Sequence, residues 1–131
     1  FVLSQLFDEY ILKPIHKYTL LKSRIAYSLA YYGKEYMNPL SLNGKNTEKM
    51  VDAYQTESEE IRKVAAELKG FIEERPLSAF LLPSEKDMLN AYTGLIGLSN
   101  SLFSGNQEKW YEHTTLYEQT VISALKLKQK R

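Results

Sequence analysis

The amino-acid sequence predicts an all-α fold, an up-down-up-down four-helix bundle. In four separate segments, apolar residues recur at intervals of three and four, the spacing of one helix face. No segment alternates with the period of two that a half-buried strand requires. The connections are short, which favours antiparallel neighbours. We expect a single helical domain over residues 1–131, with helices at about 3–37, 47–74, 85–104 and 107–128.

The first helix is expected to be long and to change course near its start. Its apolar stripe covers residues 3–36, and Pro14 lies inside it. Proline has no backbone N–H and its ring collides with the preceding turn, at a cost of about 3 kcal/mol in a helix interior. A kink or a short break is therefore predicted near Lys13. The Asn-Pro pair at 38–39 ends this helix, because a residue before proline avoids the helical region.

The other helices have recognisable ends. Asn46 or Thr47 can cap the second helix, and Ser84 followed by Asp87 resembles a capping box that starts the third helix. Gly105 begins the turn before the fourth helix. The prolines at 76 and 83 leave only a short segment between the second and third helices.

Composition limits the classes of function. The 131 residues are 44% hydrophobic and 25% charged, as in ordinary globular proteins, and the net charge of +1 favours no nucleic-acid partner. There is no cysteine. His16 and His113 lie on different predicted helices without carboxylates at Glu-x-x-His spacing, so neither a metal site nor a cofactor is expected. With no catalytic motif recognised, the sequence favours a protein that is not an enzyme.

The third helix carries two glycines where an exposed face would normally be charged. Residues 88–107 form a run of 20 uncharged residues that is too polar to span a bilayer. Gly94 and Gly97 share the arc away from the expected core stripe with Ser101, and a helical glycine costs about 1 kcal/mol relative to alanine. These small residues would let something approach closely: another helix of the same chain, a second protein chain, or a ligand. They are candidate interface residues.

A second candidate interface lies on the first helix, away from its core stripe. Leu20, Arg24, Tyr27 and Tyr31 recur there at intervals of four, three and four, and tyrosine and arginine are enriched in binding hot spots. Alternatively, these tyrosines simply cover the core with their hydroxyls in water.

The chain ends in a basic tail. It can complement the dipole of the fourth helix, keep the end soluble, or meet anionic lipid headgroups. The candidate lipid-contact residues are Lys126, Lys128, Lys130 and Arg131.

Several short stretches together resemble a family of uncharacterised bacterial proteins with an N-terminal transmembrane segment followed by a soluble helical domain. They are YSLAYY (27–32), NP (38–39), IRKVAAEL (61–68), LPS (82–84) and LIGLSN (95–100). The resemblance covers most of the first three helices and fades over the fourth, and the residues at 33–34 depart from it. It implies a membrane anchor upstream of residue 1 and a domain at the cytoplasmic face of a bacterial membrane, and it brings no activity. Arg24, Arg62 and Asn100 are associated with these motifs and suggest a buried polar network between the first three helices, with ligand binding second.

These observations lead to a hypothesis of function. The chain is expected to be a non-enzymatic, membrane-tethered helical domain that associates with a protein partner, including a second copy of itself as a homodimer. The alternative is a sensor of a small anionic metabolite or nucleotide, with Arg24, Tyr27 and Asn100 around a pocket between the first and third helices.

Overall fold

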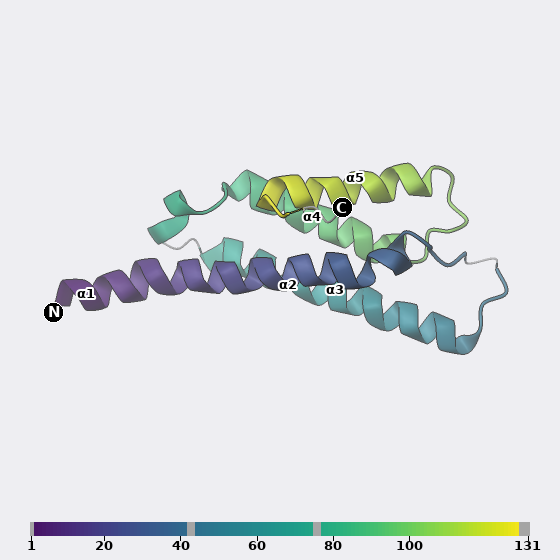
Figure 1. Cartoon of the computed structure of the whole chain (residues 1–131), viewed down its shortest axis with the longest axis horizontal. Helices are drawn as coiled ribbons and strands as arrows, with labels where there is room; N and C mark the ends of the chain where they lie inside the picture. The colour runs from purple at the N-terminus through teal and green to yellow at the C-terminus, as the bar shows by residue number, and fades with distance from the viewer. Residues whose placement is uncertain (1, 42–43, 75–76, 129–131) are drawn as a thin grey trace.

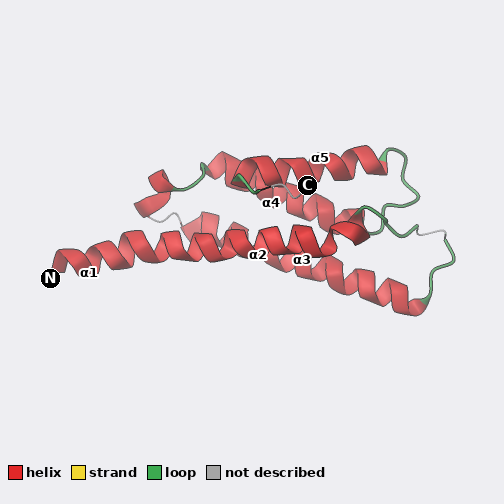
Figure 2. Cartoon of the chain, viewed as in Figure 1, coloured by secondary structure: helices red, strands yellow, loops and turns green. Residues whose placement is uncertain are grey.

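Four long helices form the molecule. The computed structural model describes residues 2–41, 44–74 and 77–128. The bundle consists of α2 (Lys13–Tyr36), α3 (Glu48–Glu74), α4 (Glu85–Ser101) and α5 (Trp110–Leu125). Successive helices run in opposite directions (Figure 1), and the described residues contain helices and loops but no strand (Figure 2). The predicted all-α four-helix bundle is confirmed.

The first helix does not break at Pro14. A short helix α1 (Val2–Phe7) continues through a π-helical turn η1 (Asp8–Leu12) into α2, and the three form one rod that extends past the end of the bundle (Figure 1). In η1 the N–H of Lys13 donates to the carbonyl of Asp8, five residues back. This wide turn lies directly before Pro14, where a regular α-helix would meet the proline ring and its missing N–H. The disturbance predicted near Lys13 is therefore a widened turn.

The predicted helix starts are stabilised by side-chain caps. The N–H of Asp87 donates to the Ser84 hydroxyl at 3.1 Å, and the N–H of Met50 donates to the Thr47 hydroxyl at 3.2 Å. Each hydroxyl satisfies one of the backbone donors that the first turn of a helix leaves free. A short 3₁₀ helix, η2 (Leu77–Leu81), connects α3 to α4.

The connection between α4 and α5 is longer than expected, because α4 ends at Ser101 and α5 begins only at Trp110. The backbone between them pairs with the loop after α2: the N–H of Leu40 donates to the carbonyl of Leu102 at 2.8 Å, and the N–H of Gly105 donates to the carbonyl of Leu40 at 2.9 Å. A β-carbon at Gly105 would stand 2.8 Å from the carbonyl oxygen of Pro39. Glycine is therefore required here by the close approach of two backbones.

Helix α4 is the central helix of the core. It packs against both α3 and α5, and its buried residues span one arc of about 160° that includes Gly94 and Ser101. The expected position of the buried face is partly wrong, because Gly94 and Ser101, which were assigned to the outer arc, are buried. The buried residues of α4 are Met88, Ala91, Gly94, Leu95, Leu98, Ser99 and Ser101.

Candidate functional site

The glycine face of α4 is covered by α5 of the same chain. A β-carbon at Gly94 would lie 2.7 Å from Cγ2 of Val121, and one at Gly97 would lie 2.6 Å from the ring of Tyr117. Ser101 is 5% exposed and donates its hydroxyl to the carbonyl of Gly97 at 2.8 Å. The assignment of Gly94, Gly97 and Ser101 to an interface with a second chain was therefore wrong. Of the three expected occupants, the one observed is a neighbouring helix of this chain.

The second predicted face, on α2, is open to solvent. Leu20, Tyr27 and Tyr31 are 53%, 60% and 61% exposed. The rings of Tyr27 and Tyr31 stack with centroids 5.3 Å apart and planes inclined by 16°. This surface is the α2 outer face, defined by Leu20, Arg24, Tyr27 and Tyr31.

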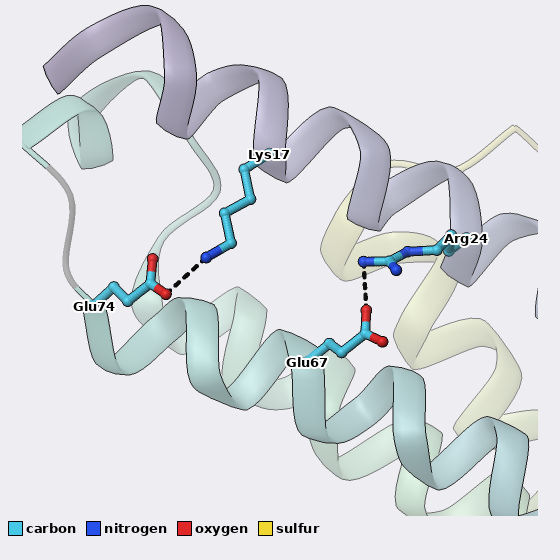
Figure 3. A network of polar contacts seen from close by, with 4 residues as sticks. All are labelled: Lys17, Arg24, Glu67 and Glu74. Atoms are coloured by element: carbon cyan, nitrogen blue, oxygen red, sulfur yellow. Dashed lines mark hydrogen bonds and ion pairs between the residues drawn. The ribbon is translucent and has the colours of Figure 1, made fainter. Parts of the chain in front are cut away.

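Two ion pairs connect α2 to α3 beside the α2 outer face (Figure 3). Nζ of Lys17 lies 2.7 Å from Oε1 of Glu74, and the guanidinium of Arg24 pairs with the carboxylate of Glu67. The two pairs are seven residues apart on both helices, which is the repeat at which antiparallel helices present equivalent positions. All four side chains remain at least one-third exposed, so each pair contributes little to stability.

The three residues expected to form one buried polar network belong to two separate, exposed contacts. Arg62 on α3 donates to the side-chain carbonyl of Asn100 on α4, whereas Arg24 pairs with Glu67. The side chains of Arg62, Asn100 and Arg24 are all exposed to solvent. The prediction of a buried network that links the three helices was therefore wrong, although one of its pairs is formed.

The expected ligand pocket is likewise divided. Arg24 and Tyr27 border a hollow on the surface of α2 alone, while Asn100 and Arg62 border one between α3 and α4. The structure does not bring Arg24, Tyr27 and Asn100 together around one cavity.

A cleft between α2 and α5 was missed by the sequence reasoning. Its volume is about 290 Å³, at the lower end for ligand pockets. Ala26 and Ala30, one turn apart on α2, leave space there, and Glu118 contributes a carboxylate from α5. The buried hydroxyl of Tyr36 donates to that carboxylate, and both burial and the adjacent Glu118 raise the pKa of Tyr36 above 10.0. The small pair on α2 was the available sequence signal.

Glu35 on α2 and Glu57 on α3 repel each other electrostatically. Oε2 of Glu35 and Oε2 of Glu57 are both buried and have no hydrogen-bond partner among the described residues. Burial raises the pKa of Glu57 above 4.5, and the charge of Glu35 raises it further. The charged form of Glu57 is therefore disfavoured in the folded protein.

The basic tail turns back at the end of α5. Lys126 adopts the left-handed conformation with φ 54°, and Lys128 is exposed. Lys130 and Arg131 lie outside the described residues. Within the described ranges no helix is long and apolar enough to cross a membrane, and no three of the His, Asp and Glu side chains are grouped to hold a metal ion.

Comparison with protein-family models, curated proteins and solved structures yields no match to this chain. The resemblance to membrane-anchored bacterial proteins stays a prediction.

Proposed function

We propose that this chain is a non-enzymatic association domain and that the α2 outer face pairs with a second copy of the chain. The observation that carries the proposal is the exposure of Leu20, Tyr27 and Tyr31 in a row on a helix whose other side is anchored in the core. Tyrosine offers a large contact area with little conformational entropy to lose. The rings of Tyr27 and Tyr31 stack on each other in the single chain.

The arm formed by α1 and η1 exposes further large side chains. None of its described side chains is buried, and Val2, Leu3, Leu6, Phe7 and Tyr10 are all large, apolar or aromatic and exposed. Isolated helices of this length are marginal in water, so packing against a second helix would stabilise the arm. An interface along α2 alone would be about 36 Å long and about 10 Å wide, an area of about 360 Å². A standard interface buries roughly 800 Å² per partner, so this one is small. The dimer is therefore expected to be weak and to depend on protein concentration.

A matched pair of variants tests the proposal. Tyr27→Glu places a charge in the α2 outer face, and Tyr111→Glu places one at a tyrosine on α5 with the same 60% exposure. Light scattering after size exclusion should give a mass that rises from 15.2 kDa toward twice that value for the parent chain and Tyr111→Glu, and stays at 15.2 kDa for Tyr27→Glu. A parent chain that is monomeric at all concentrations, or equal loss in both variants, would contradict the proposal.

The membrane tether, the position at the cytoplasmic face and the bacterial source depend on the sequence resemblance alone. The lipid-contact role of the tail also stays a prediction. Of the lysines near the same end of the bundle, Lys13 and Lys17 pair with Glu9 and Glu74, which reduces the positive charge that an anionic membrane would meet.

A further inference from the structure

The cleft between α2 and α5 differs in chemistry from the α2 outer face. Its apolar walls come from both helices and from the turn after α5. Ala26 and Ala30 present only methyl groups, so the cleft exists because neither side chain reaches α5. The apolar residues that line it are Ala26, Leu29, Ala30, Ile122 and Leu127.

The turn after α5 encloses one end of this cleft. Lys126 is left-handed, and the N–H of Leu127 donates to the carbonyl of Ile122 at 2.9 Å. This is the hydrogen-bond pattern of a Schellman motif, in which the residue after the left-handed position packs against the last turn of the helix. Leu127 is thereby fixed against the core and beside Ile122.

A single carboxylate lies among these apolar groups. Glu118 is half-buried, and its described partner is the hydroxyl of Tyr36, which donates to Oε2. Among the described residues no Lys, Arg or His forms an ion pair with Glu118, although Lys128 lines the same cleft. An ionised carboxylate only accepts hydrogen bonds, and a partly buried one is stabilised by a cation that donates to it. The polar residues that line the cleft are Glu118, Gln119 and Lys128. Since no described ion pair joins Lys128 to Glu118, the carboxylate can still accept a hydrogen bond from a positively charged ligand.

We propose that the cleft binds small amphiphiles that carry a protonated amine. The apolar chain lies against Ala26, Ala30 and Ile122, and the ammonium group donates to the carboxylate of Glu118. The Tyr36 hydroxyl occupies one side of that carboxylate and so restricts its orientation before the ligand arrives. This ligand class is opposite in charge to the anionic ligand that the sequence suggested.

Hexylamine, hexanol and hexanoate provide the test, because they share one apolar chain and differ in charge. Each is titrated at neutral pH and constant ionic strength into the isotope-labelled chain, and NMR shifts are followed at residues 26–30 and 118–127. Hexylamine should give saturable shifts at these residues and bind more tightly than hexanol, and hexanoate should bind most weakly. Equal binding of the three compounds, or saturable shifts only elsewhere, would overturn the proposal. Shifts at residues 118–127 that follow protein concentration without ligand would also overturn it, because a second copy would then occupy the cleft. Residues 26–30 do not enter this criterion, because Tyr27 belongs to the α2 outer face.

Two variants with matched controls separate charge from shape. Glu118→Gln should weaken hexylamine binding about tenfold, as expected for loss of a charge-assisted hydrogen bond, whereas Glu112→Gln, at an exposed position on α5, should not. Ala30→Leu should abolish binding by filling the cleft, and Ala66→Leu, at an exposed position on α3, should leave it unchanged. Because Ala30 is exposed, this variant keeps the test valid if Glu118→Gln impairs folding. Unchanged affinity in Ala30→Leu would refute the assignment to this cleft.

Discussion

The ring of Tyr117 on α5 rests on the backbone of Gly97 on α4, so close that a β-carbon at position 97 would lie 2.6 Å from the ring. One helix turn earlier, Gly94 meets the carbonyl oxygen of Tyr117 and the side chain of Val121 in the same way. The two glycines thus set the distance between α4 and α5, which is the main consequence of their presence in the helix.

Replacement of Gly94 by alanine should destabilise the protein, although alanine normally favours a helix more than glycine does. Gly94→Ala is expected to destabilise the fold by about 1–3 kcal/mol, because the new methyl group overpacks a rigid backbone contact. Gly70→Ala, on α3 with no atom within 4 Å of the added carbon, should stabilise by about 0.5–1 kcal/mol. Urea unfolding of the two variants measures both values. Similar gains in both would mean that α5 does not pack on this face.

Removal of the hydroxyl should change the free energy of unfolding in opposite directions at two buried tyrosines. The hydroxyl of Tyr36 donates to Glu118, so Tyr36→Phe should destabilise by about 1 kcal/mol. The hydroxyl of Tyr18 is buried without a partner among the described residues, so Tyr18→Phe should stabilise by about 1 kcal/mol. Chemical denaturation of both variants provides the comparison, and destabilisation by both would show that Tyr18 has a partner.

The alkaline limb of the stability profile should also depend on Tyr18. Burial raises the pKa of Tyr18 from 10.0 to about 12. Above pH 10.0 the unfolded chain ionises first, so the stability present below that pH is lost progressively up to about pH 12. Tyr18→Phe should reduce the slope of this loss in thermal melts recorded across that range. An unchanged slope would assign the loss to other groups.

Glu57 should make the protein more stable in mild acid. Because its pKa is raised above 4.5 in the folded state, its favourable contribution is complete below pH 4.5 and disappears as the pH rises through the higher, folded-state value. Glu57→Gln should therefore raise the melting temperature at neutral pH and have little effect in acid. Glu59→Gln, at an exposed neighbour on α3, is the control. A lower melting temperature of Glu57→Gln at neutral pH would contradict the electrostatic repulsion between Glu35 and Glu57.

The ion pair between Arg24 and Glu67 should contribute weakly. A double-mutant cycle with alanine at both positions is expected to give a coupling free energy of about 0.2–1 kcal/mol, because both side chains are partly solvated. The coupling should fall in high salt. Coupling that is large or independent of salt would indicate a buried contact.

The left-handed residue after α5 offers a stabilising substitution. Lys126 has φ 54°, a conformation that costs most residues about 1 kcal/mol more than glycine. Lys126→Gly should therefore raise the free energy of unfolding by up to about 1 kcal/mol, whereas Lys128→Gly should not. Thermal unfolding distinguishes the two. Loss of stability in Lys126→Gly would mean that its side chain makes a contact worth more than the backbone strain.

Much of the fold could be predicted because burial imposes its period on the sequence. The stripe that includes Leu21 and Ile25 had to face a core, and the Ser84 cap had to precede a helix. The helical period cannot, however, reveal how many neighbours a helix has. Helix α4 has two large packing partners, so Gly94 faces α5 although it lies away from the expected stripe.

The candidate sites were harder to predict because they depend on the rotation of one helix relative to another. Exposure of Leu20 and Tyr27 follows from their position opposite the core stripe. The pairing of Arg24 with Glu67 instead of Asn100, and the cleft beside Ala30, depend on how α2 faces α3 and α5. The spacing of apolar residues predicts each helix separately, but it does not predict how one helix is rotated relative to its neighbour.

The π-helical turn has a consequence for how the chain tolerates insertions and deletions. Such a turn holds about one residue more than an α-helical turn, so deletion of one residue within Asp8–Leu12 would convert it to a regular α turn and leave α1 at nearly the same angle about the rod axis. Pro14 opposes that deletion, because a regular helix there would again meet its ring. The proline therefore favours retention of the extra residue in this turn, although the direction of α1 does not depend on it.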